Sequence, residues 1–423
     1  MKSNAKSTGK SGGAAASKKA AGAGKVWSDA HGLGLRAETR ERARKGLIAC
    51  GDWAVRNQVR HAWPAWDANA GRFPYHVHLA TDRFNLSTSW NTARTVQGLL
   101  GAWKVLGDAR YLEAARWGLE YILSLQYFFP EEPRARGAFI EETPLGNHIG
   151  ARDGMECTQA LVNFHRLTGD GRALVRAEAF LDWLSGAYES ADWPMNYTYF
   201  LPEWKSSKGD AHTDFIFMCG AIPLLQFAEL TGAKKYGALG LKFADTILKK
   251  YQAADGSFRL DRHYKSHHMP KEGDSTVFND DGAGAALICA WRYSREKKYL
   301  DAAVAYADWW LGQDLNVLPG NFAMPLCLSL TIADVARATG EKRFLEFLER
   351  LAPTVFKLQV VRDERPLIAG AFLGEDMADV YRAGAEKGDF ISLRSVSYGL
   401  IALGKLAAGG AKDWNLAYSG FGW

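Results

Sequence analysis

Side chains able to do chemistry gather in four stretches of this 423-residue chain. In the first stretch, LGNHIGARDGMECTQAL, Asn147 and His148 stand just before a helical pattern. Arg152, Asp153 and Glu156 then fall on the first turns of a helix that is otherwise largely apolar. Burying such groups is costly unless they are paired or face a cleft, so the stretch could supply a base and charged groups to a site. The alternative is that Asn147 caps the helix and His148 is an ordinary loop histidine.

The second stretch holds one histidine, and the third holds three. In GDAHTDFIF, His212 and Asp214 stand at the start of another apolar helix, where an acid is also favoured by the helix dipole alone. The third stretch, SFRLDRHYKSHHMPKEGDSTVFNDDG, contains Arg259, Arg262, His263, Tyr264, His267, His268, Asp280 and Asp281. A histidine-rich tract can bind metal, but this one lacks an HExxH pattern and any cysteine, so we expect neither a metal nor a cofactor. Asp280 and Asp281 are candidate catalytic acids or caps of the helix that follows.

The fourth stretch, LSTSWNTAR, carries Trp90, Asn91 and Arg94 at the start of the first apolar helix. Further aromatic residues crowd the loops: Trp63, Trp66, Tyr75, Trp193, Tyr197, Tyr199 and Trp204. Packing within the loops would explain most of these rings one at a time. With 15 tryptophans in the chain, we expect some of the rings to offer their apolar faces to sugar rings.

A helical repeat positions these clusters. A short turn, an aromatic or apolar residue and an Ala- and Leu-rich amphipathic helix recur, with equivalent positions at Tyr111, Ala173, Tyr236, Tyr299 and Phe344. Each copy follows a helix that is apolar on most faces; a sixth apolar helix, FISLRSVSYGLIALGKLA, comes last, and RERARKGLIACGDWAV begins the amphipathic set. A helix that is apolar all round is buried, whereas an amphipathic helix covers a surface. The repeat therefore predicts six inner and six outer helices in alternation.

The joints between the helices gather the polar clusters at one end. Inner-to-outer joints are short and carry TGD, TGA or TGE, where glycine suits a helix C-terminus. Outer-to-inner joints are long and carry Gly-x-Phe, beginning at Gly71, Gly137, Gly256 and Gly370. We therefore predict an all-α (α/α)6 toroid whose cleft lies among the long loops, at the N-terminal ends of the inner helices. The positive ends of those helix dipoles favour an anionic group. An open solenoid is the alternative architecture.

Composition limits the remaining possibilities. A hydrophobic fraction of 47% and a charged fraction of 23% are ordinary for a globular protein, and no apolar run is long enough for a membrane span. Six lysines among the first 25 residues account for more than the net charge of +5, so we expect no nucleic-acid partner. We expect residues 1–26 to be a disordered tail without a secretory signal, and 27–423 to be one catalytic domain; localisation stays open. The five cysteines are expected to be buried free thiols.

The ring of alternating helices with Gly-x-Phe loops resembles the α/α-toroid carbohydrate enzymes over nearly the whole chain after the tail. The Asn-His pair, with Arg and Tyr on a later loop, looks like the toroid polysaccharide lyases that cut alginate or glucuronan by β-elimination. The resemblance implies that Asn147 and Arg262 neutralise a uronate carboxylate and that His148 or His212 removes the C5 proton. Tyr264 would then protonate the leaving oxygen. Such a reaction needs electrostatic stabilisation of the enolate and an acid and base within hydrogen-bonding reach.

Other activities on the same ring remain open. A glycoside hydrolase needs two carboxylates, one of them protonated, and Asp280, Asp281 and Glu156 are the main candidates, beside Asp153, Asp214, Glu141 and Glu142. The adjacent Asp280 and Asp281 resemble the double acid of some toroid mannan-cleaving enzymes. A sugar epimerase and a non-catalytic sugar-binding protein are less favoured. For each enzyme class we expect an oligo- or polysaccharide substrate bound by Trp90, Asn91, Arg94, Arg152, Tyr197, Tyr199, Trp204, His263 and His267.

Overall fold

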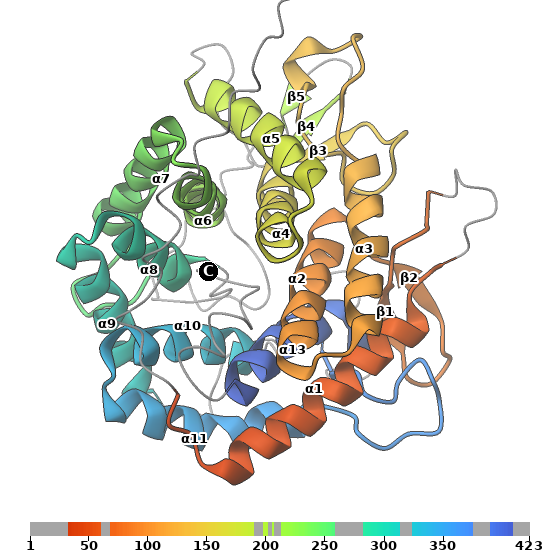
Figure 1. The fold of residues 1–423 in the computed structure, drawn as a ribbon, viewed down its shortest axis with the longest axis vertical. Coiled ribbons are helices and arrows are strands. Elements are labelled where there is room, and N and C mark those ends of the chain that lie inside the picture. The colour runs from red at the N-terminus through yellow and green to blue at the C-terminus, as the bar shows by residue number, and fades with distance from the viewer. Residues whose placement is uncertain are drawn as a thin grey trace, which may run out of the picture.

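The computed structural model describes residues 33–60, 68–189, 198–201, 205–206, 213–258, 282–313, 324–374 and 390–408. Within these ranges six apolar helices surround the centre of the molecule (Figure 1): α2 (Ser89–Leu106), α4 (Ala151–Thr168), α6 (Thr213–Thr231), α8 (Ala283–Ser294), α10 (Met324–Thr339) and α13 (Leu393–Ala407). Each of them packs against the next, and α13 packs against both α10 and α2. The inner helices therefore form a closed ring, and the open solenoid is wrong.

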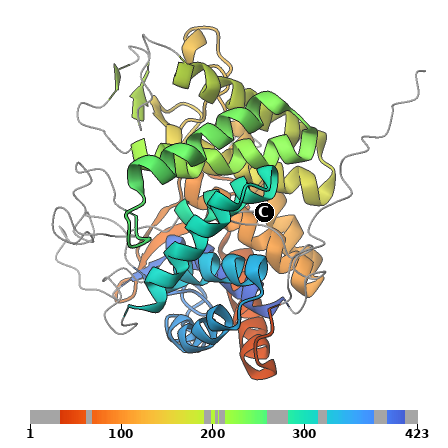
Figure 2. The same ribbon diagram turned by 90° about the vertical axis from the view of Figure 1, so that its left-hand side faces the viewer.

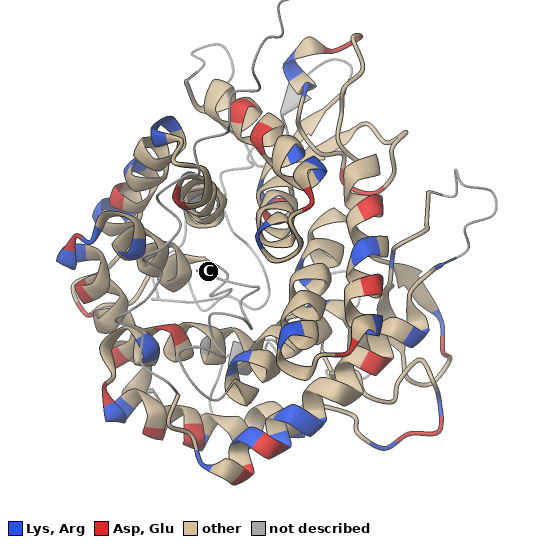
Figure 3. Ribbon diagram, viewed as in Figure 1, with Lys and Arg blue, Asp and Glu red and all other residues tan. Residues whose placement is uncertain are grey.

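Amphipathic helices surround this ring: α1 (Ala37–Asn57), α3 (Ala109–Ser124), α5 (Gly171–Glu189), α7 (Lys234–Thr246), α9 (Lys297–Leu311) and α11 (Lys342–Lys357). A π-helical turn, η2 (Ile247–Tyr251), extends α7. Helices α3 to α11 pack on the inner helix that precedes them, whereas α1 packs on α13 at the other end of the sequence. The outer helices carry more of the charged residues than the inner helices do (Figure 3). The predicted all-α (α/α)6 toroid is thus confirmed.

The long loops contain short strands that the sequence did not predict. One antiparallel sheet joins β2 (Phe84–Leu86), β1 (Pro74–His78) and β6 (Phe390–Ser392), and the other joins β3 (His148–Gly150), β4 (Thr198–Phe200) and β5 (Lys205–Ser206). A single 3-10 turn, η1 (Pro133–Ala135), lies in the loop after α3. The strands gather on one side of the ring (Figure 2), where β3 leads directly into α4 and β6 directly into α13. They therefore fix the loops over the N-terminal ends of inner helices.

Four described loops with a Gly-x-Phe sequence each fasten one outer helix to the next. After α3, the Gln126 side-chain amide donates to the carbonyl oxygens of Gly137, at 2.8 Å, and of Arg176 in α5, at 2.9 Å. Gly137 has φ 95°, and a β-carbon there would lie 2.3 Å from the Ala179 carbonyl oxygen, so only glycine fits. The same arrangement recurs at the pairs Gln58 and Gly71, Gln252 and Gly256, and Gln359 and Gly370. Through the last pair, Gln359 and Gly370, the loop that follows α11 is bound to α1, and this contact stabilises ring closure.

Neighbouring outer helices are also joined at the equivalent positions of the repeat. The tyrosine hydroxyl in the first turn of one helix donates to an aspartate of the preceding outer helix, as in Tyr111 to Asp52, Tyr236 to Asp182 and Tyr299 to Asp245. At Phe344, which has no hydroxyl, the adjacent Arg343 pairs with Asp308 instead.

All five cysteines are buried and free, as expected, and burial raises the pKa of the Cys289 thiol to about 12. None of the described helices is both long enough and apolar enough to cross a membrane.

Candidate active site

Many of the residues proposed from the sequence lie outside the described residues. These are His212, Arg259, Arg262, His263, Tyr264, His267, His268, Asp280, Asp281, Trp63, Trp66, Trp193, Tyr197 and Trp204. Asp214 lies in the first turn of α6, as expected from the sequence. The described part of the site therefore comes from the loops and helix starts around α2, α4 and α13.

Asn147 and His148 belong to the loop and to β3 and do not begin the helix. The N-cap of α4 is Gly150, so the alternative in which Asn147 caps this helix is wrong. Asn147 is exposed, and its carbonyl oxygen accepts the N–H of Leu201 at 2.7 Å. The half-buried His148 ring stacks on Phe200 with 5.3 Å between ring centroids, because β3 and β4 pair these two residues. Strand pairing thus sets the position of His148.

A series of buried charges connects α2 with α4. The Arg94 side chain is 0% exposed, and its Nη2 donates to Glu156 Oε1. Arg152 Nη2 lies 3.7 Å from the same oxygen, and Arg152 Nη1 lies 3.2 Å from Asp153 Oδ1. The spacing from Arg152 to Glu156 is one helical turn, which places both on the same face of α4. Two guanidinium groups therefore hold Glu156 in one orientation.

Aromatic rings support both arginines. The Arg152 guanidinium carbon lies 4.5 Å from the Trp90 ring centroid, and that of Arg94 lies 4.4 Å from the Tyr398 centroid. Tyr75 meets Trp90 edge-on, with 6.4 Å between centroids. Cation–π contacts of this kind strengthen where water is excluded. Trp90 and Arg94 were proposed from one stretch of the sequence and Arg152 from another, and the structure brings them into one cluster.

Glu141 and Asp153 form a buried pair of carboxyl groups beside this cluster. Glu141 lies in the loop between α3 and β3, is 9% exposed, and accepts the Ser89 N–H on its backbone carbonyl at 2.9 Å. Burial raises the pKa of Glu141 well above its usual range, and the charge and hydrogen bond of Asp153 raise it further. Glu141 consequently keeps a proton at a pH at which an exposed glutamate has lost it. The sequence signal was the pair of acids in FIEE, directly after the Gly-x-Phe of this loop.

Two further polar residues lie near these helix starts. Asn91 is fully buried, and neither atom of its side-chain amide has a hydrogen-bond partner among the described residues. His76, which the sequence analysis did not single out, stacks on Tyr75 at 4.0 Å and lies opposite Ser392 in the β1–β6 pairing. The alternating pattern of PYHVH in β1 is the signal that could have found it. Tyr199 is only 1% exposed and meets Trp183 edge-on, which is the loop-packing role considered for these aromatic residues.

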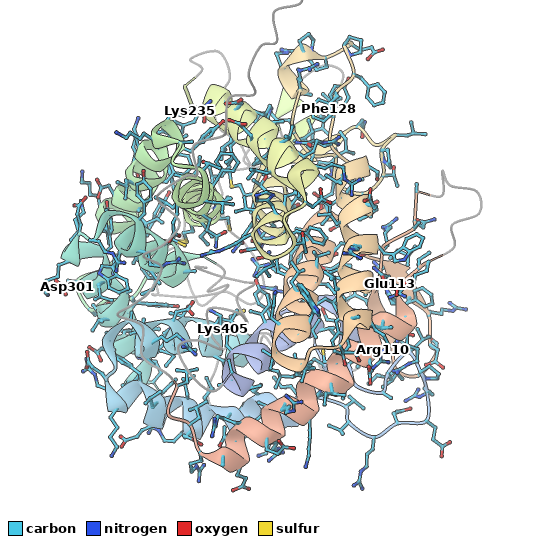
Figure 4. The ribbon with its side chains drawn as sticks, in the orientation of Figure 1. Arg110, Glu113, Phe128, Lys235, Asp301 and Lys405 are labelled. Atoms are coloured by element: carbon cyan, nitrogen blue, oxygen red, sulfur yellow. The ribbon has the colours of Figure 1, made fainter. Side chains whose placement is uncertain are left out.

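The C-terminal ends of the inner helices hold a separate set of buried charges. Lys405 Nζ lies 2.5 Å from Asp334 Oδ1, and both side chains are buried. Figure 4 shows Lys405 inside the ring. Arg292 at the end of α8 pairs with Glu229 at the end of α6, at 2.8 Å. Cations at helix C-termini are favoured by the helix dipole, so this end of the ring has a structural explanation. No group of three or more His, Cys, Asp or Glu side chains in the described ranges could hold a metal ion.

The sequence matches no protein-family model and no curated protein sequence. Solved structures with the same fold include a sugar epimerase from a ruminal bacterium, with a TM-score of 0.63, 12% identity, and coverage of 86% of this chain and 98% of that one. An unsaturated glucuronyl hydrolase specific for heparin has a TM-score of 0.63 at 12% identity, covering 87% of this chain and 97% of the other.

A third similar structure is an α-1,6-mannanase of Salegentibacter sp., made inactive by replacing two adjacent aspartates and bound to α-1,6-mannotriose. Its TM-score is 0.55 at 12% identity, covering 88% of this chain and 98% of the mannanase. At such identities the likeness establishes the α/α-toroid fold alone. The neighbours include a hydrolase, an epimerase and a mannanase, which all act on sugars according to their names.

Proposed function

We propose that this chain is a carbohydrate-active enzyme, and specifically a glycoside hydrolase that cleaves an oligo- or polysaccharide at the N-terminal end of its inner helices. The observation that carries the proposal is the buried pair of carboxyl groups, Glu141 and Asp153, beside the start of α4. In this proposal residues 27–423 act as one catalytic domain, and residues 1–26 are an appended tail.

The chemistry of glycoside hydrolysis accounts for such a pair. A general acid must donate a proton to the glycosidic oxygen as the bond breaks, so it has to be protonated near neutral pH. Glu141 meets this condition because its pKa is raised by burial and by the neighbouring Asp153 carboxylate. Once Glu141 has given up its proton, repulsion between the two carboxylates favours its reprotonation. We therefore assign Glu141 the role of general acid, and Asp153 the role of raising the pKa of Glu141.

A hydrolase also needs a second carboxylate on the other side of the scissile bond. Glu156 is held by Arg94 and Arg152, which suits it to stabilise positive charge or orient the arginines rather than to move a proton. Asp280 and Asp281 are the better candidates, because they precede α8 directly in the sequence. In the order of the ring α8 lies opposite α2. The inactivated mannanase, with its two adjacent aspartates replaced, supports this choice.

The test is to incubate the protein with neutral and uronic polysaccharides and to measure new reducing ends and ultraviolet absorbance together. We expect reducing ends without absorbance from the wild type, and a loss of at least a hundredfold in Glu141→Gln, the order of magnitude general acid catalysis contributes. The matched control is Glu142→Gln, because Glu142 is the neighbouring acid and is exposed. Equal activity of both variants would remove Glu141 from the mechanism.

A polysaccharide lyase is the second candidate, and the Arg152 guanidinium favours it. Arg152 lies in the first turn of α4, over the half-buried Trp90, where the positive end of the helix dipole also attracts a carboxylate. In such a lyase Arg152 would join Asn147 and Arg262 in neutralising the uronate, and His148 or His212 with Tyr264 would move the protons. Absorbance rising with alginate or glucuronan, and lost in Tyr264→Phe, would establish this reaction. A change of sugar configuration without chain cleavage or absorbance would indicate an epimerase instead.

A further inference from the structure

A groove runs along the outer face of α5, away from the carboxyl groups described above. One hollow of about 570 Å³ is lined by Phe128, Arg134, Arg136 and Trp183 among others. A second hollow of about 580 Å³ lies beside Glu120, Leu123 and Arg172. Val175 and Arg176 line both hollows, so the two form one elongated depression between α5 and the end of α3 with the loop that follows it. Figure 4 shows Phe128 at the periphery of the ring, beside α5.

The groove carries positive charge that its own acids do not neutralise. Glu120 is bound by Arg172 at 2.7 Å, and Asp182, which also lines the groove, is bound by Lys235 at 2.7 Å. Arg134 pairs with Glu132 at 2.6 Å. Arg136 and Arg176 make no ion pair among the described residues; Arg176 donates only to the uncharged Gln126 side chain and the Leu123 carbonyl. Two guanidinium charges therefore remain for a ligand.

The same two arginines are held in place by an aromatic ring. The guanidinium carbon of Arg176 lies 4.6 Å from the Phe128 centroid, and that of Arg136 lies 5.6 Å from it. An arginine fixed by its contacts loses less side-chain entropy when it binds a carboxylate in bidentate geometry. Val175, which is 67% exposed, adds an apolar patch between the two hollows. The groove thus offers ordered cations beside an apolar wall.

We propose that this groove is a second binding site, which holds an acidic oligosaccharide in extended form through its carboxylates on Arg136 and Arg176. That the ligand is a saccharide rests on the proposed function, whereas its negative charge and its length rest on the groove itself. The loop that carries Arg136 continues through Phe139 and Ile140 to Glu141, so a chain bound here lies beside the loop that contributes Glu141 to the carboxyl pair. The lysine-rich residues 1–26 contain no acid and have the wrong charge to occupy the groove.

The test is calorimetric titration of the full chain with an oligouronate and with a neutral oligosaccharide of the same length. All titrations use the Glu141→Gln background, which removes turnover. We expect Arg136→Ala to weaken oligouronate binding about tenfold, the loss of one charged hydrogen-bonded contact, and to leave neutral-sugar binding unchanged. The matched control is Arg42→Ala, because Arg42 is also an exposed arginine stacked on a phenylalanine, at 4.6 Å from the Phe356 centroid in α11. It should bind like its parent.

Three results would overturn the inference. Oligouronate binding that is unaffected by Arg136→Ala, or no oligouronate binding at all, would remove the site. An equal loss for neutral sugar would show that the arginine does not select for charge. If a single-stranded oligonucleotide bound more tightly than the oligouronate, and this binding depended on Arg136, the groove would be a site for another class of ligand. The proposed function can fail separately. If the protein bound oligouronate through Arg136 but hydrolysed no polysaccharide, the binding-site proposal would stand and the hydrolase proposal would be wrong.

Discussion

Glu141 Oε2 and Asp153 Oδ2 converge on the backbone of Gly150, and each lies 2.6 Å from the position that a β-carbon on that residue would occupy. The two acids are brought together by the β3 strand, which turns directly into α4 at Gly150. Both carboxyl groups are buried, and two buried carboxylates this close would repel each other. Glu141 therefore keeps a proton that it would lose in an exposed pair. The glycine and the two acids therefore form one unit.

Gly150→Ala should disrupt this unit. The added methyl group would press on both carboxyl oxygens, and we expect activity to fall by at least tenfold and the free energy of unfolding by about 1–3 kcal/mol. The control is Gly404→Ala in α13, where a β-carbon meets no atom within 4 Å and alanine favours the helix. A Gly150→Ala variant as active and as stable as this control would contradict the tight packing of the pair.

Glu141→Gln should inactivate the protein and yet stabilise it at neutral pH. Because the folded state raises the pKa of Glu141, the unfolded chain loses this proton first as the pH rises above about 4.3. The stabilising contribution of protonated Glu141 is then lost between that pH and the higher folded pKa. A glutamine has no proton to lose, so the stability advantage of Glu141→Gln over the wild type should grow as the pH rises through this range. Urea unfolding from pH 4 to 8 measures it, and parallel curves for both proteins would refute the shift.

The buried pair of Lys405 and Asp334 should contribute strongly to the stability of the ring. Lys405→Met takes the ammonium group away from the buried Asp334 carboxylate, so it should cost about 3–5 kcal/mol of unfolding free energy. Adding Asp334→Asn to that variant should restore part of the loss, and a double-mutant cycle gives the coupling between the two residues. A coupling near zero would mean that neighbouring charges, and not this pair, determine the cost.

The Gly-x-Phe glycines should tolerate alanine less well than the glycines at helix C-termini. Gly137 and Gly107 both have positive φ, of 95° and 77°, but only at Gly137 would a β-carbon meet a backbone oxygen, at 2.3 Å. We expect Gly107→Ala to cost about 1 kcal/mol from backbone strain alone. Gly137→Ala should cost several times more, because the backbone of α5 has to move. Thermal unfolding of the two variants gives the comparison, and equal losses would contradict this reason.

The fold could be derived from the sequence because its signals are local and repeated. Burial of one helix and amphipathicity of the next follow from residues within a few turns of each other, and glycine marks the joints. The glutamines that fasten the Gly-x-Phe loops, such as Gln126, were missed. A glutamine that binds two carbonyl groups looks like any other polar residue until the loop folds back on it.

The candidate site depended on the tertiary structure to a greater degree. Local patterns singled out Arg152 and Glu156 in one stretch and Arg94 in another, but Arg94 and Glu156 are 62 positions apart and meet only because α2 and α4 are neighbours in the ring. Likewise, nothing local indicates that the first outer helix packs on the last inner one. Local sequence patterns were sufficient to predict the helices and the end of the ring on which the polar loops lie. They could not show which charges are paired or which carboxyl group keeps a proton, because pairing and desolvation depend on neighbours distant in the chain.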